Sequence, residues 1–299
     1  MLSLYGPILE QCEPYLIANP WIVQDLNLQP LGLSIPPENV LHPQERRHGP
    51  FLAMLQLVDK LTFGPFGMEM PSWVFYDCAV MPGAVFGLAI RAERLEDWAR
   101  EAMNVPADYN GLVPVSLFIA IPMLAGFSEG AQVPHTWLLY TLESLNQVSP
   151  GIAPAGILKV TLALGLKVFP IKTLYGTTQW RSPKLKVYAD LGPLELVTAY
   201  TPAHSLPRTL SFRLPLEEVH HNTVLASPRV HPAAPPPNTL LDVDDVEALQ
   251  RLQRDIEEGQ KVLVVGHTIE HGAHVRVPLH CVPRQGVPRQ GVPQPRQGL

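Results

Sequence analysis

The sequence is poor in charge and lacks any block of basic residues. Charged residues make up 16% of the 299 residues, below the ~25% that is typical of soluble domains. A net charge of −5 without a basic cluster argues against nucleic acid as a partner. Apolar residues reach 46%, enough for a sizeable core, and with so few charges they are compatible with a homo-oligomer.

Cysteine is scarce, and long apolar runs are absent. Cys12, Cys78 and Cys281 show no motif spacing, which argues against a disulfide framework and favours a reducing compartment. The uncharged apolar run 112–127 is too short for a membrane helix and is interrupted by proline and glycine. The first residues include Glu10 and Glu13 and no basic region, so they do not resemble a signal peptide. We therefore expect a cytoplasmic protein without membrane association.

The sequence also lacks the common signatures of enzymes. It has no glycine-rich phosphate loop, no hydrolase nucleophile elbow and no metalloprotease motif. Four histidines stand close together near the C-terminus: His267, His271, His274 and His280. Imidazoles at this density can bind zinc, but no cysteine or carboxylate completes a recognised spacing. We therefore predict neither a metal nor an organic cofactor.

Proline and glycine divide the chain into five segments. Residues 1–49 are proline-rich and are expected to form an arm that covers a core. Residues 50–226 carry the pattern of a main domain, and 227–241 form a proline-rich linker. Residues 242–282 predict an amphipathic helix followed by a hairpin, and the VPRQG repeats of 283–299 predict disorder.

Short strands dominate the predicted main domain, with helices at 50–63, 93–103 and 154–168. The helix at 93–103 carries an apolar stripe of Leu95, Trp98 and Ala102. Residues bounded by proline or glycine predict strands at 172–180, 184–192, 194–202 and 208–216, and residues 135–145 form a strand or a helix. This composition predicts an α+β fold with a curved antiparallel sheet or barrel.

Three segments, in this order, resemble the acetoacetate decarboxylase-like superfamily: AIRAERLEDWAREAMNVP, GFSEGAQVPH and LGLKVFPIKTLYGTTQWRSPKLKVYADLG. The first is similar to the family's strand and helix and to the proline that follows this helix. The second resembles its glutamate-bearing segment, and the third its helix end and hairpin. The resemblance covers about residues 70–215 and implies an antiparallel, barrel-like cone with flanking helices. In active members of that family a lysine forms a Schiff base with an oxo acid.

The resemblance implies Glu129 as the carboxylate of the site, and Lys159 is the amine nearest to the family's lysine position. A buried lysine with a lowered pKa attacks carbonyl groups. Lys159, Ala163 and Lys167 are also spaced as one helical stripe, so both lysines could instead mark the exposed edge of a buried helix.

Four further side chains are candidates for substrate binding. Asp77 and Glu143 lie within apolar strand patterns, where a buried carboxylate needs a partner or a function. Gln132 and His135 could line the mouth of the same site. Each of the four is equally compatible with a structural role.

Two functions follow from these observations. The first is a Schiff-base lyase for a small oxo acid, in which Lys159 forms the imine and Glu129 moves protons, as in a decarboxylase or a related aldol or dehydratase enzyme. The second is a barrel without catalytic activity that binds a small apolar or acidic ligand.

Overall fold

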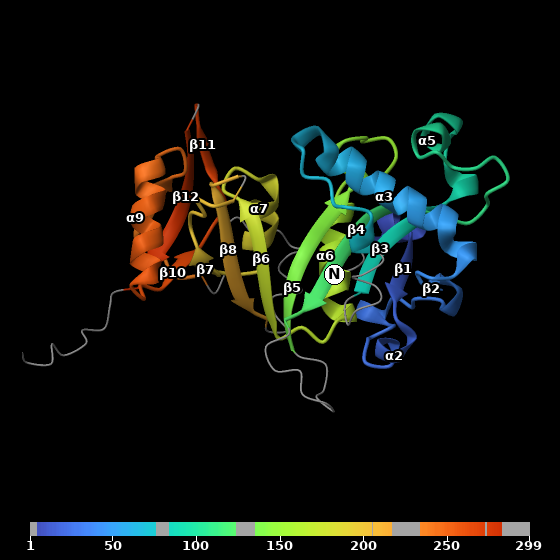
Figure 1. The fold of residues 1–299 in the computed structure, drawn as a ribbon, viewed down its shortest axis with the longest axis horizontal. Helices are drawn as coiled ribbons and strands as arrows, with labels where there is room; N and C mark the ends of the chain where they lie inside the picture. Colours follow the sequence, from blue (N-terminus) through green and yellow to red (C-terminus); the bar gives the residue numbers. More distant parts are fainter. Residues whose placement is uncertain are drawn as a thin grey trace, which may run out of the picture. The chain divides into compact units, whose positions relative to one another are not determined.

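The computed structural model describes residues 5–75, 84–123, 135–204, 206–216, 234–272 and 274–282 (Figure 1). The chain forms two compact units, which are described one by one. Unit 1 consists of Met1–Thr177 with Arg213–Pro228, and unit 2 of Thr178–Phe212 with Arg229–Leu299. The chain passes from one unit to the other within β6 and again within β8.

Unit 1 is built on a mixed sheet with the strand order β2-β1-β3-β4-β5-β6. Its strands are β1 Glu13–Ala18, β2 Val40–Leu41, β3 Ala84–Arg91, β4 Leu112–Pro122, β5 Thr136–Ser144 and β6 Thr173–Gln179. The pairs β1–β3, β3–β4 and β4–β5 are antiparallel, whereas β1–β2 and β5–β6 are parallel. Helix α6, Ile157–Val168, is the crossover that a parallel β5–β6 pair requires.

The predicted closed antiparallel barrel is wrong. Within each unit the described strands form an open row that does not close into a ring, with β2 at one edge in unit 1 and β11 at one edge in unit 2. The two parallel pairs also contradict an antiparallel meander. Alternating patterns predict strands but not which strands pair, and the crossover through α6 makes its flanking strands parallel.

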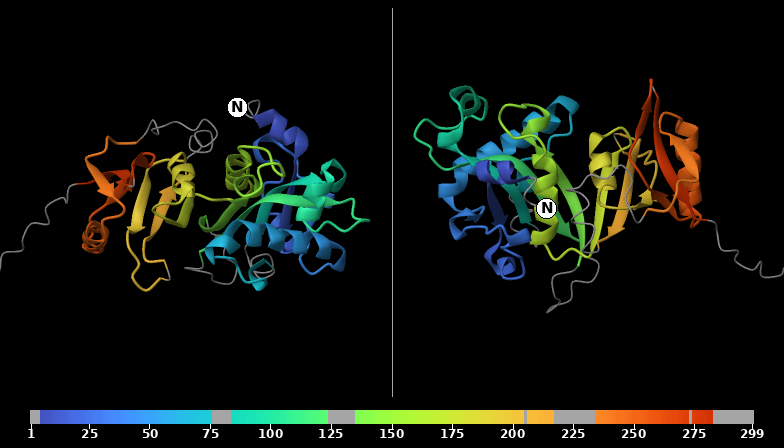
Figure 2. Two further views of the ribbon diagram at one scale, coloured as in Figure 1. Left: turned by 90° about the horizontal axis from the view of Figure 1, so that it is seen from above. Right: turned by 180° about the vertical axis from the view of Figure 1, so that it is seen from behind.

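Helices cover both faces of the unit 1 sheet, α3 on one side and α6 on the other (Figure 2). Helix α3, Gly49–Phe63, confirms the predicted helix that Pro50 begins. Its Phe51 contacts the ring of Tyr15 on β1 edge-on, with 4.8 Å between the ring centroids. Since both faces are covered, all residues of β4 except Ile121 are buried.

Helix α6 packs closely on the opposite face of the sheet. A Cβ atom at Gly165 would lie 2.9 Å from the ring of Phe118, so only glycine permits this approach. Thr161 and Ser116 share a buried hydrogen bond of 2.6 Å between their hydroxyl groups. Ser116 also accepts the backbone N–H of Leu88 at 3.2 Å, where the β3–β4 register shifts.

The first residues of the chain belong to the core of unit 1. They form α1, Gly6–Gln11, then β1 and α2, Pro20–Val23. The central residues of β1 are fully buried within the sheet. Asn27 then binds the last turn of α6: its backbone N–H donates to the carbonyl of Val168 at 2.8 Å, and its Nδ2 donates to that of Lys167 at 3.1 Å. These contacts provide hydrogen-bond donors to carbonyl groups that have no partner within the helix.

Two predicted elements differ in the structure. The predicted helix 93–103 is shortened to α5, Asp97–Ala102, and its buried residue is Ala99, whereas Trp98 is 47% exposed. The predicted strand 184–192 is helix α7, Pro183–Ala189. Ser182 caps α7 by accepting the backbone N–H of Lys184 at 3.2 Å, and Pro183 suits the first turn.

Unit 2 has the strand order β8-β7-β10-β12-β11, and β9 also pairs with β12. Its strands are β7 Leu194–Thr198, β8 Thr209–Pro215, β9 Thr239–Asp242, β10 Val262–Val264, β11 Ile269–His271 and β12 His274–Cys281. Helix α9, Val246–Glu257, confirms the predicted amphipathic helix, and Asp245 caps it by accepting the N–H of Ala248 at 2.9 Å. The antiparallel pair β10–β12 confirms that the last two predicted strands meet.

Among the described helices, none combines the length and the apolar composition that a membrane crossing requires.

Candidate functional site

Of the six residues that the sequence singled out, the structure describes Lys159, Glu143 and His135, and these three do not meet at one site. Asp77, Glu129 and Gln132 lie outside the described residues. Lys159 lies on α6, and Glu143 and His135 lie at opposite ends of β5. The roles of these residues therefore stay predictions.

Lys159 and Lys167 are the two residues of α6 that are not buried. The backbone N–H of Lys159 donates to the carbonyl of Gly156 at 3.1 Å in the first turn, and Lys167 lies in the last turn. Ala163, midway between them, has no exposed surface. The two lysines are therefore separate, partly exposed positions and do not form one continuous edge.

Glu143 is fully buried, and the hydroxyl of Thr141 donates to its Oε1 at 2.7 Å. In the register of the sheet, Glu143 shares a row with Gly87 and Tyr15 on the side of α3. Burial, and secondly the charge of Glu143, raises the pKa of the Tyr15 phenol. Glu143 thus lies on the face of the sheet opposite to α6 and Lys159.

His135 lies directly before β5, about 26 Å from Glu143 along a strand that rises ~3.3 Å per residue. Its Nδ1 lies 3.1 Å from the carbonyl oxygen of Pro170. Its own carbonyl accepts the N–H groups of Lys172 and Thr173 at 2.7 and 3.0 Å. These bonds join the start of β5 to the start of β6.

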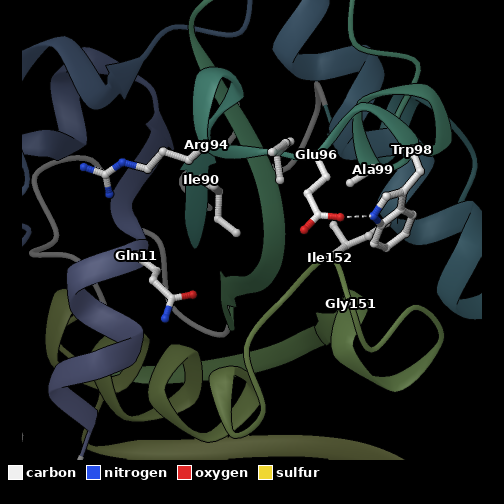
Figure 3. A pocket seen from close by; sticks show the side chains of 9 residues that line it. Gln11, Ile90, Arg94, Glu96, Trp98, Ala99, Gly151 and Ile152 are labelled. Atoms are coloured by element: carbon white, nitrogen blue, oxygen red, sulfur yellow. Dashed lines mark hydrogen bonds between the residues drawn. The ribbon is translucent and has the colours of Figure 1, made fainter.

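Two hollows open where β3 ends, on opposite faces of the unit 1 sheet. Successive side chains of a strand point to opposite faces. Arg91 lines a hollow of about 240 Å³, which we call the Arg91 hollow. Ile90, the preceding residue, lines one of about 170 Å³, which we call the Glu96 hollow (Figure 3).

The Arg91 hollow lies beside the start of α3. Its lining includes Asn39, Arg47, His48, Phe51, Arg91 and Tyr109. These residues come from distant parts of unit 1, so the fold brings them together. Several of the groups at this hollow have perturbed pKa values, which is a common property of functional sites.

Arg91 is held in place by a bidentate ion pair with Glu13. Its Nε and Nη2 donate to the two carboxylate oxygens at 2.7 and 2.8 Å. The hydrogen bond from Arg91 lowers the pKa of Glu13, so this carboxylate is ionised. Asn39 adds a contact to Glu13 at 3.4 Å and donates to the carbonyl of Pro14 at 3.1 Å. The guanidinium is therefore pre-oriented, and a planar anion can bind its remaining N–H groups.

His48 directly precedes α3, and its side chain is only 12% exposed. Burial, and then the charge of Arg47, lowers the pKa of its imidazole, which is therefore neutral at pH 7. Its Nε2 lies 3.4 Å from a carboxylate oxygen of Glu45. Helix α3 continues directly from the 3₁₀ turn Arg46–His48: the N–H of Gly49 donates to the carbonyl of Arg46, and Pro50 has no N–H.

Tyr109 also lines the Arg91 hollow. Burial raises its pKa to about 12, so its phenol stays protonated. The hydroxyl donates to the carbonyl of Leu112 at 2.7 Å. A Cβ atom at Gly111 would come within 2.6 Å of that hydroxyl, so glycine makes room for the ring. A rigid wall of this kind is suited to a ligand site.

The sequence did not single out Arg47, His48, Arg91 or Tyr109. One signal was present: Arg46, Arg47 and His48 form a basic run directly before α3. Cations at a helix N-terminus oppose the helix dipole, so such a run suggests a role other than stability. The position of Arg91 beside this run depends on the pairing of β1 with β3, which the sequence does not encode locally.

In unit 2, the described histidine side chains of the C-terminal segment bind separate partners. Nε2 of His267 lies 2.5 Å from Oδ1 of the buried Asp190. Nδ1 of His274 lies 3.0 Å from Oδ2 of Asp242, and Nδ1 of His280 lies 2.8 Å from a backbone carbonyl. These imidazoles therefore do not converge on one point.

Asp242, Asp244 and His274 bring possible metal-ligand atoms within 4.8 Å of one another. Asp244, however, accepts two hydrogen bonds from Arg181, at 2.9 and 2.5 Å, and one from Arg208 at 3.2 Å. A cation would have to compete with both guanidinium groups for this carboxylate. The cluster is better described as an ion-pair network.

Comparisons with known proteins give little similarity. No protein-family description matches the chain, and no curated protein matches it in sequence. Among solved structures, the crystal structure of the AHL synthase LasI is similar, with 13% sequence identity and a TM-score of 0.36. The match covers 61% of this chain and 90% of that one.

The resemblance to the acetoacetate decarboxylase-like superfamily is therefore wrong. The described strands form open sheets with two parallel pairs, whereas the resemblance implied an antiparallel, barrel-like cone. The quoted segments follow the family's order of helices and strands. That order alone does not determine which strands pair. The last segment also contains α7, where the family resemblance implied the second strand of a hairpin.

Proposed function

We propose that unit 1 binds a small carboxylic acid, such as a 2-oxo acid, in the Arg91 hollow. The observation that carries this proposal is the pre-oriented guanidinium of Arg91 beside Arg47. Fixed N–H donors favour a planar anion of this kind. The acid would lie against the apolar edge of Phe51.

The hollow favours an acidic ligand over a purely apolar one. An apolar ligand would remove water from Arg91 and Arg47 without replacing their hydrogen bonds, which costs free energy. A carboxylate replaces those bonds with charge-assisted ones. The neutral imidazole of His48 can serve as an additional donor.

Schiff-base chemistry at Lys159 remains a separate prediction. Lys159 lies on α6, which covers the face of the sheet opposite to the Arg91 hollow. An acid bound in the hollow therefore does not need that amine. Borohydride reduction in the presence of 2-oxo and 3-oxo acids tests the lyase directly, because an imine with Lys159 would leave a covalent adduct on its peptide.

Binding is tested by titrating the ¹⁵N-labelled full chain with pyruvate and with acetone, its neutral counterpart. We expect saturable shifts of resonances around Arg91 and Tyr109 with pyruvate alone. Arg47→Gln should weaken binding about three- to tenfold, the range for loss of one partly solvated charge contact. Arg46→Gln removes the same charge from the neighbouring residue, which does not line the hollow, and should leave affinity unchanged.

Arg47 suits this test because its side chain is 74% exposed, so its replacement leaves the fold intact. The proposal fails if pyruvate and acetone give the same shifts. It also fails if Arg46→Gln and Arg47→Gln weaken binding equally, because the effect would then reflect general charge and not the hollow.

A further inference from the structure

The Glu96 hollow has a chemistry different from that of the Arg91 hollow. Glu96 and Gln11 point into it from opposite sides, and Trp98 closes one end (Figure 3). Nε1 of Trp98 donates to Oε2 of Glu96 at 2.6 Å, and the other carboxylate oxygen turns toward the hollow (Figure 3). The carboxylate is thus oriented by the indole and keeps one oxygen for a ligand.

The position of Trp98 is itself fixed by the backbone. A Cβ atom at Gly151 would lie 2.8 Å from the indole ring, so the ring lies directly against this glycine. Gly151 belongs to the connection from β5 to α6. Ligand sites in sheets with parallel strands commonly lie beyond the carboxyl end of a strand, and this connection follows the carboxyl end of β5.

The floor of the Glu96 hollow is apolar. Ile90, Ala99 and Ile152 line it, and each is less than a tenth exposed. A ligand that fills the hollow therefore needs an apolar body as well as a group that pairs with Glu96. The volume of about 170 Å³ limits that body to a few carbon atoms.

The charge around the hollow favours a cation. Residues 93–101 contain four acidic residues, Glu93, Glu96, Asp97 and Glu101, and two arginines. Arg94 also lines the hollow, but it extends away from Glu96 (Figure 3), and its Nη1 donates to the carbonyl of Glu10 at 3.0 Å. Arg100 donates to the carbonyls of Ala92, Pro106 and Tyr109. Both guanidinium groups are thus directed to backbone oxygens.

We propose that the Glu96 hollow binds a small alkylammonium group. Its ammonium would donate to the remaining oxygen of Glu96 and to the side-chain carbonyl of Gln11. Its alkyl part would cover Ile90 and Ile152. The face of Trp98 at the end of the hollow adds a cation–π contact. This site is independent of the acid proposed for the Arg91 hollow, since the two lie on opposite faces of the sheet.

The probe is isobutylammonium chloride, added to the ¹⁵N-labelled full chain. The indole N–H resonance of Trp98 reports on the hollow directly, and Trp98→Phe identifies it among the five tryptophans. We expect a saturable shift at millimolar concentration with isobutylammonium. Isobutanol, which has the same body without charge, and isobutyrate, which has the opposite charge, should give no comparable shift.

Glu96→Gln removes the charge while it keeps an acceptor for the indole N–H. We expect it to weaken isobutylammonium binding about tenfold or more, as expected for loss of a charge-assisted hydrogen bond. Glu93→Gln is the matched control: it removes the same charge from the same segment, outside the lining. It should change affinity by less than about twofold, as an exposed charge does.

Three results would overturn the proposal: no saturable shift with isobutylammonium, an equal shift with isobutanol or isobutyrate, or equal losses in Glu96→Gln and Glu93→Gln. Unchanged resonances of the other four indoles show that each variant is folded. If Glu96→Gln does not fold, the comparison of the three probes on the natural chain still decides the question.

Discussion

Ile90 and Arg91 are consecutive residues of β3, yet their side chains line separate hollows on opposite faces of one sheet. Arg91 contributes a guanidinium to one hollow, and Ile90 contributes an apolar side chain to the other. The alternation of a strand is enough to place these different side chains one residue apart. Substitutions in the two hollows can therefore be interpreted separately.

Binding of an acid to the Arg91 hollow should depend on pH through His48. The pKa of this imidazole is lowered from 6.5, so the ring gains its proton only as the pH falls below that value. The added positive charge lies among Arg47, Glu45 and the bound acid. We expect pyruvate affinity to rise between pH 7 and pH 5, measured by isothermal titration calorimetry. His48→Gln should remove this dependence of pyruvate affinity on pH. A constant affinity of the natural chain between pH 7 and pH 5 would contradict the role of His48.

The ion pair between Glu13 and Arg91 should make folding sensitive to acid. The pKa of Glu13 is lowered from 4.5 in the folded chain, so its contribution to stability is complete above that value. The contribution is lost as the pH falls through the lower, folded pKa. The free energy of unfolding in urea should fall more steeply below pH 4.5 for the natural chain than for Glu13→Gln. Parallel curves for the two proteins would refute this expectation.

Gly165→Ala should destabilise unit 1. The new methyl group would lie 2.9 Å from the Phe118 ring, which is stacked on Phe169 in the core. Such overpacking costs about 1–3 kcal/mol, more than the ~1 kcal/mol that alanine adds to helix propensity. Urea midpoints of the natural chain and of Gly165→Ala measure this effect, and equal midpoints would contradict it.

Cys12 should resist alkylation in the folded protein. Burial raises the pKa of its thiol to about 12, and thiolate is the reactive form. Cys281 is partly exposed and should react with iodoacetamide under native conditions. Peptide mass spectrometry should find Cys12 modified only when urea unfolds the chain. Equal labelling of Cys12 and Cys281 without urea would show that the core around β1 opens readily.

Local signals predicted the helices well. Pro50 at the start and Gly64 after the end define α3, and the acidic cap at Asp245 defines the start of α9. In α7 the local signal was misinterpreted. Ser182 and Pro183 indicate the start of a helix, whereas the alternation that follows them predicts a strand.

Pairing between distant segments could not be predicted from the sequence. β1 contributes Glu13 to the Arg91 ion pair, although its sequence suggested only part of an arm. Glu143 was correctly noted as a carboxylate within an apolar strand, but its position beside Tyr15 follows from the register of three strand pairs. The hollows depend on the same register, and for this reason their lining residues were missed.

Neither unit of the chain is a continuous stretch of sequence. Unit 1 is completed by Arg213–Pro228, which is synthesised only after the first part of unit 2. In this returning segment, the backbone N–H of Leu216, directly after β8, donates to the carbonyl of Lys172 at 2.8 Å. A nascent chain that stops at Thr177 lacks both this bond and β8. Unit 1 therefore cannot mature fully during translation until residues beyond β8 have emerged.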